Sequence, residues 1–197
     1  MVKGMQEVMD VMEKVKGDLA AQGGLKQVIF VACGGSFASS YPARYLLGQE
    51  SSLKVLGYNS SEFVNATPKT VGPGTLVIAT STKATAETVE ALKVAKAKGA
   101  VTVGLSGYAD SLTAQTADYY ITYYHADEWY QDPSLVHCNS QGTALKIAFW
   151  LLKEMCIRDR SYFTDAGTTV NVVDDSTVEF VLAAPCEIGR ASCRDRV

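Results

Sequence analysis

Val28-Ile29-Phe30-Val31-Ala32 is a continuous apolar run rich in β-branched residues, and Cys33-Gly34-Gly35-Ser36 follows it directly. A short apolar run without alternation is typical of a strand that is buried on both faces of a sheet. The glycines then predict a sharp turn, after which a helical pattern continues to about Gly48. This strand, turn and helix are the first indication of a parallel sheet.

The same alternation repeats along the chain and predicts the fold class. We expect an amphipathic helix at 5–20, because apolar residues recur there at three- and four-residue spacings, namely Met5, Val8, Met9, Met12, Val15 and Leu19. The further expected strands are 53–58, 76–79, 101–105 and 118–124. The further expected helices are 85–98, 110–117 and 135–153, with a short helix or a turn at 60–65. Alternating strands and helices predict an α/β fold, a three-layer, doubly wound, flavodoxin-like domain with a five-stranded parallel sheet. Ligands of such sheets bind at the carboxyl ends of the strands, where the strand order reverses.

The composition limits the class of protein. The chain has 197 residues, a net charge of −3, 47% hydrophobic and 20% charged residues, which is typical of a globular domain. The mild acidity argues against nucleic acid or an anionic membrane as a partner, since both require a basic patch. Because no apolar run approaches roughly 18 residues and the N-terminus is charged, we expect no membrane span and a cytoplasmic protein. Five cysteines without a CxxC pair disfavour a disulfide framework and a zinc site.

The C-terminal part differs in composition from the rest. Five of the six arginines follow residue 155, whereas all twelve lysines lie at or before Lys153. Residues 155–160 and 187–194 resemble translated sequencing-adapter sequence, and residues 161–185 resemble a β-hairpin of extracytoplasmic solute-binding proteins. We therefore expect a domain at 1–154 and a chimeric or artefactual tail at 155–197; a basic appendage is the alternative.

Two of the expected strand ends carry unusual polar residues. The loop at 80–85 leads into a helix, and it contains Lys83 and four hydroxyls, at Thr80, Ser81, Thr82 and Thr85. The free N–H groups and the positive dipole end of a helix N-terminus favour an anion. A helix cap needs only one hydroxyl, so four of them predict a phosphate site.

The other loop, Gly34-Gly35-Ser36, allows a close approach to the backbone and adds the Ser36 hydroxyl. It matches neither the P-loop nor the dinucleotide-binding pattern, because the required lysine and third glycine are absent. Two adjacent strand ends of this kind can enclose one small ligand.

Several motifs occur together in the order and spacing of one family. They are Val31-Ala32-Cys33-Gly34-Gly35-Ser36, Tyr41-Pro42-Ala43, Tyr58-Asn59-Ser60-Ser61-Glu62-Phe63, the loop at 80–85, and Gly104-Leu105 followed by Asp110-Ser111-Leu112. In this combination, residues 1–154 resemble a sugar isomerase (SIS) domain. The resemblance is nearest to the fructosamine 6-phosphate deglycases, and next to the isomerase half of glucosamine-6-phosphate synthase.

The resemblance implies a phosphorylated sugar as ligand, without a metal or organic cofactor, and a homo-oligomer in the intact parent protein. The implied contacts are Gly35, Ser36, Thr80, Ser81, Thr82 and Thr85. The parent is then expected to hydrolyse a 6-phosphorylated Amadori adduct. The alternatives are an isomerase or aminotransferase acting on fructose 6-phosphate and a non-catalytic sugar-phosphate sensor. The loop at 80–85 departs from the Ser-Gln-Ser-Gly-Glu-Thr pattern of the synthases, which weakens a role in hexosamine synthesis.

No catalytic residue is assigned. The resembled enzymes use a glutamate and a histidine of a second SIS domain, so we expect this chain to be inactive by itself. Glu62 occupies the analogous helix here, where an exposed carboxylate is the simpler interpretation. We expect His125 and His137 to be structural or on the surface, and Cys33 to be a small buried residue. An aromatic cluster predicts an exposed apolar patch and self-association; it comprises Tyr119, Tyr120, Tyr123, Tyr124, Trp129 and Tyr130.

Overall fold

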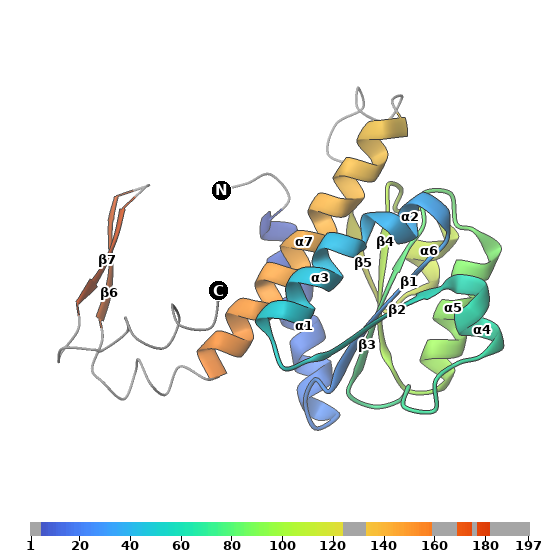
Figure 1. The fold of residues 1–197 in the computed structure, drawn as a ribbon, viewed down its shortest axis with the longest axis horizontal. Coiled ribbons are helices and arrows are strands. Elements are labelled where there is room, and N and C mark those ends of the chain that lie inside the picture. Colours follow the sequence, from blue (N-terminus) through green and yellow to red (C-terminus); the bar gives the residue numbers. More distant parts are fainter. Residues whose placement is uncertain (1–4, 124–132, 159–168, 175–176, 182–197) are drawn as a thin grey trace, which may run out of the picture. The chain divides into compact units, whose positions relative to one another are not determined.

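The computed structural model describes residues 5–123, 133–158, 169–174 and 177–181, and the chain divides into two compact units, Met1–Leu152 and Lys153–Val197. The first unit contains a five-stranded, fully parallel sheet in the order β2-β1-β3-β4-β5 (Figure 1). Its strands are β1 (Gln27–Ala32), β2 (Lys54–Asn59), β3 (Thr75–Thr80), β4 (Val101–Ser106) and β5 (Tyr119–Thr122). This architecture confirms the predicted fold class.

Helices cover both faces of the sheet because successive side chains of each strand point to opposite faces. Val28 and Phe30 pack with α1 (Met5–Ala21), α3 (Tyr41–Glu50) and α7 (Pro133–Arg158). Ile29 and Val31 pack instead with α4 (Ser60–Asn65) and α5 (Ala86–Ala97). The short helix α6 (Leu112–Thr116) lies against α5 and β4 on this second side (Figure 1). Two apolar cores thus enclose the central strands, which explains why they are apolar without alternation.

The helical stretch after the glycine turn differs from the prediction in one respect. It consists of two helices, α2 (Gly34–Ser39) and α3, which meet at Ser40. Pro42 lies in the first turn of α3, where its missing N–H leaves no intrahelical bond unmade. The break at Ser40 therefore lets the chain keep Pro42 without a kink.

The strand order places the two predicted loops side by side. From β1 the chain goes to β2 on one side and then crosses to β3 on the other side, so the strand order reverses between β1 and β3. Ala32, the last residue of β1, pairs with Thr80, the last residue of β3. The loops at 33–36 and 81–85 consequently begin at neighbouring points on the carboxyl edge of the sheet.

The second unit contains an antiparallel pair, β6 (Thr169–Asp174) and β7 (Thr177–Val181), with an irregular register between Val172 and Asp174. This pair confirms the strand pair expected from the sequence. The chimeric or artefactual origin of residues 155–197 stays a prediction.

The expected apolar patch is wrong for the part of the aromatic cluster that the structure describes. Tyr123 is buried and Tyr119 and Tyr120 are half-buried, whereas Tyr124, Trp129 and Tyr130 lie outside the described residues. Self-association stays a prediction. Within the described ranges, no helix combines the length and the apolar character needed to cross a bilayer.

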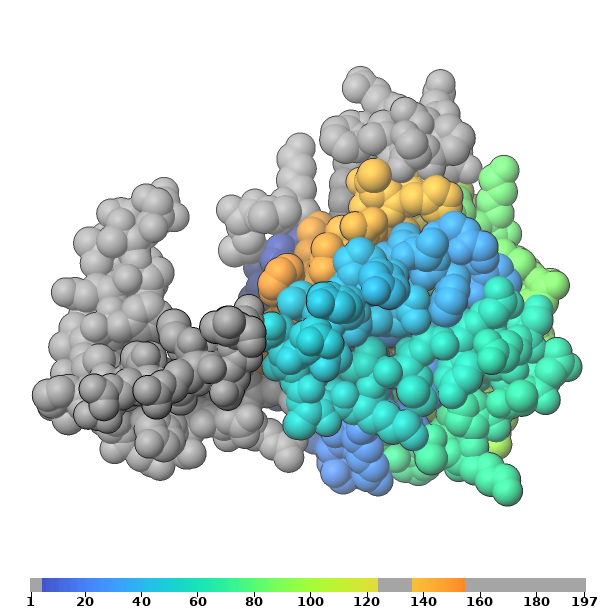
Figure 2. All heavy atoms as spheres, viewed as in Figure 1, coloured from blue at the N-terminus to red at the C-terminus, as the bar shows by residue number. Residues whose placement is uncertain are grey.

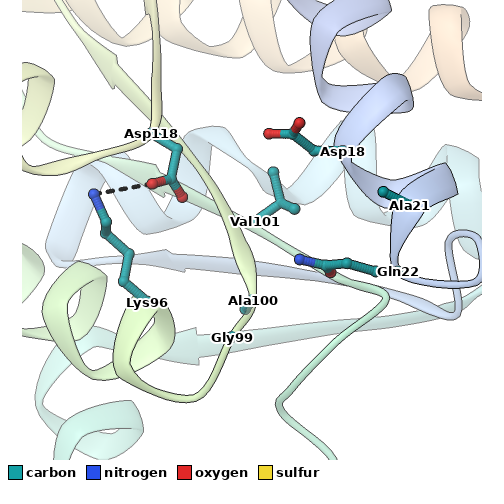
Figure 3. A pocket seen from close by; sticks show the side chains of 8 residues that line it. All are labelled: Asp18, Ala21, Gln22, Lys96, Gly99, Ala100, Val101 and Asp118. Carbon is teal, nitrogen blue, oxygen red and sulfur yellow. Dashed lines mark ion pairs between the residues drawn. The ribbon is translucent and has the colours of Figure 1, made fainter.

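A polar network of Asp118, Thr102 and Lys96 lies at the opposite, amino edge of the sheet. The Asp118 carboxylate accepts hydrogen bonds from the Thr102 N–H (3.0 Å) and hydroxyl (2.6 Å), and Lys96 Nζ lies 2.9 Å from its other oxygen. Figure 3 shows this ion pair beside a shallow cavity of about 350 Å³ that Asp18 and Gln22 also line. The network joins the start of β4 to the residue that precedes β5.

The same contacts set the ionisation of Asp118. Partial burial alone would raise the pKa of Asp118, but the hydrogen bonds from Thr102 and Lys96 together lower it below the ordinary value of 3.8. The carboxylate is therefore favoured in the folded state.

We predict that Asp118→Ala lowers the free energy of unfolding at pH 7 by about 1–3 kcal/mol, because Thr102 loses its acceptor. A carboxylate with a lowered folded-state pKa stabilises the fold at every pH above its unfolded-state pKa. This contribution is lost as the pH falls through the folded-state pKa. The difference in the free energy of unfolding between wild type and variant should therefore become smaller below about pH 4. Urea denaturation at several pH values measures this, with Asp110→Ala as a control at an exposed carboxylate. Equal stabilities at pH 7 would contradict the account.

Candidate functional site

The first loop of the carboxyl edge is shaped by its glycines. Cys33 is still extended, and Gly34 adopts a left-handed φ of +54° as it begins α2. Glycine occupies this region without the steric penalty of a side chain. The turn leaves Gly35 exposed and Ser36 half-exposed at the edge of the sheet.

The second loop is held by Ser81. The Ser81 hydroxyl accepts the Thr85 N–H at 2.8 Å and lies 3.1 Å from the Thr85 hydroxyl, while the Ser81 N–H donates to the Leu105 carbonyl. The hydrogen bond from the Thr85 N–H to the Ser81 hydroxyl spans Ala84, which has a left-handed φ of +54° that is unfavourable for alanine. Thr85 occupies the N-cap position of α5 without using its side chain as a cap. Ser81 is therefore a structural residue of the loop.

Tyr123, just after β5, orients one of the candidate hydroxyls. Its buried phenol donates a hydrogen bond of 2.8 Å to the Thr82 oxygen. Because Tyr123 supplies the proton for this bond, the Thr82 hydroxyl keeps its own proton to donate elsewhere. The sequence pattern indicated only an aromatic patch at Tyr123; this contact, which joins residues 41 positions apart, was not predicted.

The six predicted site residues lie at one edge of the sheet, but they differ in accessibility. Thr80 and Ser81 are each only 3% exposed, Ser36 and Thr82 are half-exposed, and Gly35 and Thr85 are exposed. Lys83 is also exposed. The groups that can reach a ligand directly are thus Gly35, Ser36, Thr82 and Thr85.

The buried hydroxyl of Thr88 connects the elements that lie beneath the two loops. Thr88 of α5 bonds through its Oγ1 to the Ser60 hydroxyl at 2.8 Å, and lies 3.9 Å from the Cys33 sulfur. It therefore joins the starts of α4 and α5 to the end of β1. Cys33 is half-buried, and Glu62 is exposed on α4 in line with the simpler interpretation of that carboxylate.

Helix α7 brings His137 to the first loop. A Cβ atom added at Gly35 would lie 2.6 Å from His137 Nε2 and 3.1 Å from Nδ1, so the imidazole occupies the space of a side chain at this position. The buried Ser140 hydroxyl donates to the Ser39 oxygen at 2.7 Å, which anchors α7 against α2. Figure 2 shows α2 in blue and the early part of α7 in yellow side by side at the surface.

His137 is exposed, as expected, but its position beside Gly35 was not predicted. His125 lies outside the described residues. Within the part of the chain that the structure describes, no group of three or more His, Cys, Asp or Glu side chains could hold a metal ion.

The chain is similar to known proteins over most of this domain. Residues 25–153 match the SIS domain family. Fructosamine deglycase FrlB of Bacillus subtilis (strain 168) is 37% identical over 150 residues, which is 75% of this chain and 43% of that protein. Fructoselysine 6-phosphate deglycase of Escherichia coli K12 is 32% identical over 57% of this chain and 32% of its own length.

A solved structure shows the same relationship. A protein of Salmonella typhimurium LT2, described as a phosphosugar isomerase, aligns with a TM-score of 0.65 and 34% identity, over 78% of this chain and 46% of that one. The chain thus spans less than half the length of these relatives.

We predict that Ser81→Ala lowers the free energy of unfolding by about 1–2 kcal/mol, because the Thr85 N–H loses its acceptor beside a left-handed alanine. Thr85→Ala should lower it by less than half as much, since the exposed Thr85 side chain does not cap α5. Chemical denaturation of both variants measures the difference. If Thr85→Ala were the more destabilising change, this description of the loop would be wrong.

Proposed function

The chain belongs to the SIS domain family, and from this membership we propose that the two loops at the carboxyl edge bind a phosphorylated sugar. The observation that carries the proposal is the register of β1 with β3, which brings the two hydroxyl-bearing loops to one point. This point is also where the strand order reverses, the usual ligand position in doubly wound sheets.

The phosphate is best placed at the second loop. Helix α5 has 12 residues, and its first N–H groups and positive dipole end lie directly behind this loop. Thr82 and Thr85 add hydroxyl donors, and Ser36 adds a third from the start of α2, after the neighbouring strand. Neutral donors of this kind can hold a phosphate without a metal ion.

Within that class of ligand, we propose the substrate of a fructosamine 6-phosphate deglycase. The 37% identity to a fructosamine deglycase supports this choice, as does the departure of residues 80–85 from the synthase pattern. In the full-length protein, a carboxylate would move a proton between C1 and C2 of the sugar. Hydrolysis of the C–N bond by water would then release the amine and a hexose 6-phosphate.

In this reaction the described residues act in binding and orientation. The described side chains at the loops include hydroxyls, Lys83 and the His137 imidazole, and among the described residues no hydrogen bond joins the exposed Glu62 to them. A cytoplasmic homo-oligomer remains our expectation for the parent protein. An isomerase or aminotransferase acting on fructose 6-phosphate and a non-catalytic sugar-phosphate sensor stay as alternative predictions.

We predict that fructose 6-phosphate raises the thermal stability of the chain and that fructose does so far less. A ligand that binds only the native state stabilises it by about 2.7 kcal/mol at a hundredfold excess over Kd. Thr82→Glu should abolish this stabilisation, because its carboxylate would face the phosphate. Ala97→Glu, at an exposed position near the end of α5, adds the same charge at the opposite edge and is the control. Equal stabilisation by both sugars would exclude a phosphate site.

We also predict that Lys83→Ala weakens binding of fructose 6-phosphate by less than about threefold, since Lys83 is exposed and solvent screens its charge. Calorimetric titration at low and high salt measures both the affinity and its salt dependence. A loss of more than tenfold that disappears at high salt would show instead that Lys83 pairs directly with the phosphate.

A further inference from the structure

We infer that His137 is a ligand-binding residue that contacts the sugar moiety rather than the phosphate. The inference rests on the proposed phosphosugar site and adds to it a side chain from α7. It starts from the surroundings of Gly35: the three heavy atoms nearest to a Cβ built there all belong to the His137 ring. The imidazole therefore lies directly against the first loop at Gly35.

Helix α7 is held in place next to His137, whereas the imidazole itself is accessible to a ligand. Ser140, one turn further along α7, donates to Ser39 at 2.7 Å and also lies 3.2 Å from the His137 carbonyl oxygen. Both serines are buried, so this part of α7 is fixed to α2. The His137 side chain itself is exposed, and among the described residues neither ring nitrogen makes a hydrogen bond.

The position of the ring indicates which part of the ligand it contacts. The phosphate donors lie in the loop after β3, whereas Gly35 and the His137 ring beside it lie at the loop after β1, the neighbouring strand of the sheet. A phosphate at the N-terminus of α5 leaves the sugar carbons to extend toward a neighbouring element. A neutral imidazole both donates and accepts, which suits the hydroxyl and carbonyl groups of a sugar.

The contact also gives a reason for glycine at position 35. Any side chain there would displace the His137 ring from the site. Gly35→Ala should therefore affect sugar binding through His137, and the two substitutions should not be additive.

The test is calorimetric titration of the full 197-residue chain with fructose 6-phosphate and, separately, with inorganic phosphate. We expect His137→Ala to weaken binding of fructose 6-phosphate three- to tenfold, the loss of one or two hydrogen bonds, and to leave binding of phosphate unchanged. Cys138→Ala, at the next exposed position of α7, is the matched control and should change neither. Gly35→Ala should weaken binding of fructose 6-phosphate, but should have no further effect in a His137→Ala background.

The outcomes separate this inference from the proposed function. Unchanged binding of fructose 6-phosphate by His137→Ala, or an equal loss for both ligands, would overturn the assignment of His137 to the sugar. Additive effects of Gly35→Ala and His137→Ala would overturn the steric coupling. If the wild-type chain bound neither ligand, the proposed phosphosugar site itself would be wrong.

Discussion

Parallel pairing of β1 with β3 is the constraint on which the site depends. Each strand is buried by helices on both faces, so its side chains and register are fixed by packing. With Ala32 opposite Thr80, both strands end at the same level, and the chain turns away from the sheet in opposite directions after them. The two polar loops therefore begin side by side, which is the arrangement that the proposed phosphosugar site requires.

The hydroxyl groups of the carboxyl edge have two separate functions. Ser60, Ser81 and Thr88 are buried and hold the loops in position: Ser60 bonds to Thr88, and Ser81 accepts the Thr85 N–H. Ser36, Thr82 and Thr85 remain accessible and can donate to a ligand. A count of hydroxyls in the sequence does not distinguish these groups, because burial depends on where α4 and α5 pack against the sheet.

The parts of the fold that depend on local pattern could be predicted from the sequence. The run Val28–Ala32, the glycine turn and the hydroxyls at 80–85 identified the inner strand β1 and both loops. The contacts of Tyr123 with Thr82 and of His137 with Gly35 could not be predicted, because they join residues far apart in the chain through tertiary packing. The division between α2 and α3 was missed because Pro42 is compatible both with a kink and with a first turn.

The most direct test of the central claim is an NMR titration of the isotope-labelled chain with fructose 6-phosphate. The account predicts that the largest changes in amide chemical shift occur at Ser36, Thr82 and Thr85, on the carboxyl edge. The amides around the cavity of the opposite edge, at Gln22, Lys96 and Asp118, should remain unchanged. Shift changes confined to that cavity, or none at saturating ligand, would contradict a phosphosugar site between β1 and β3.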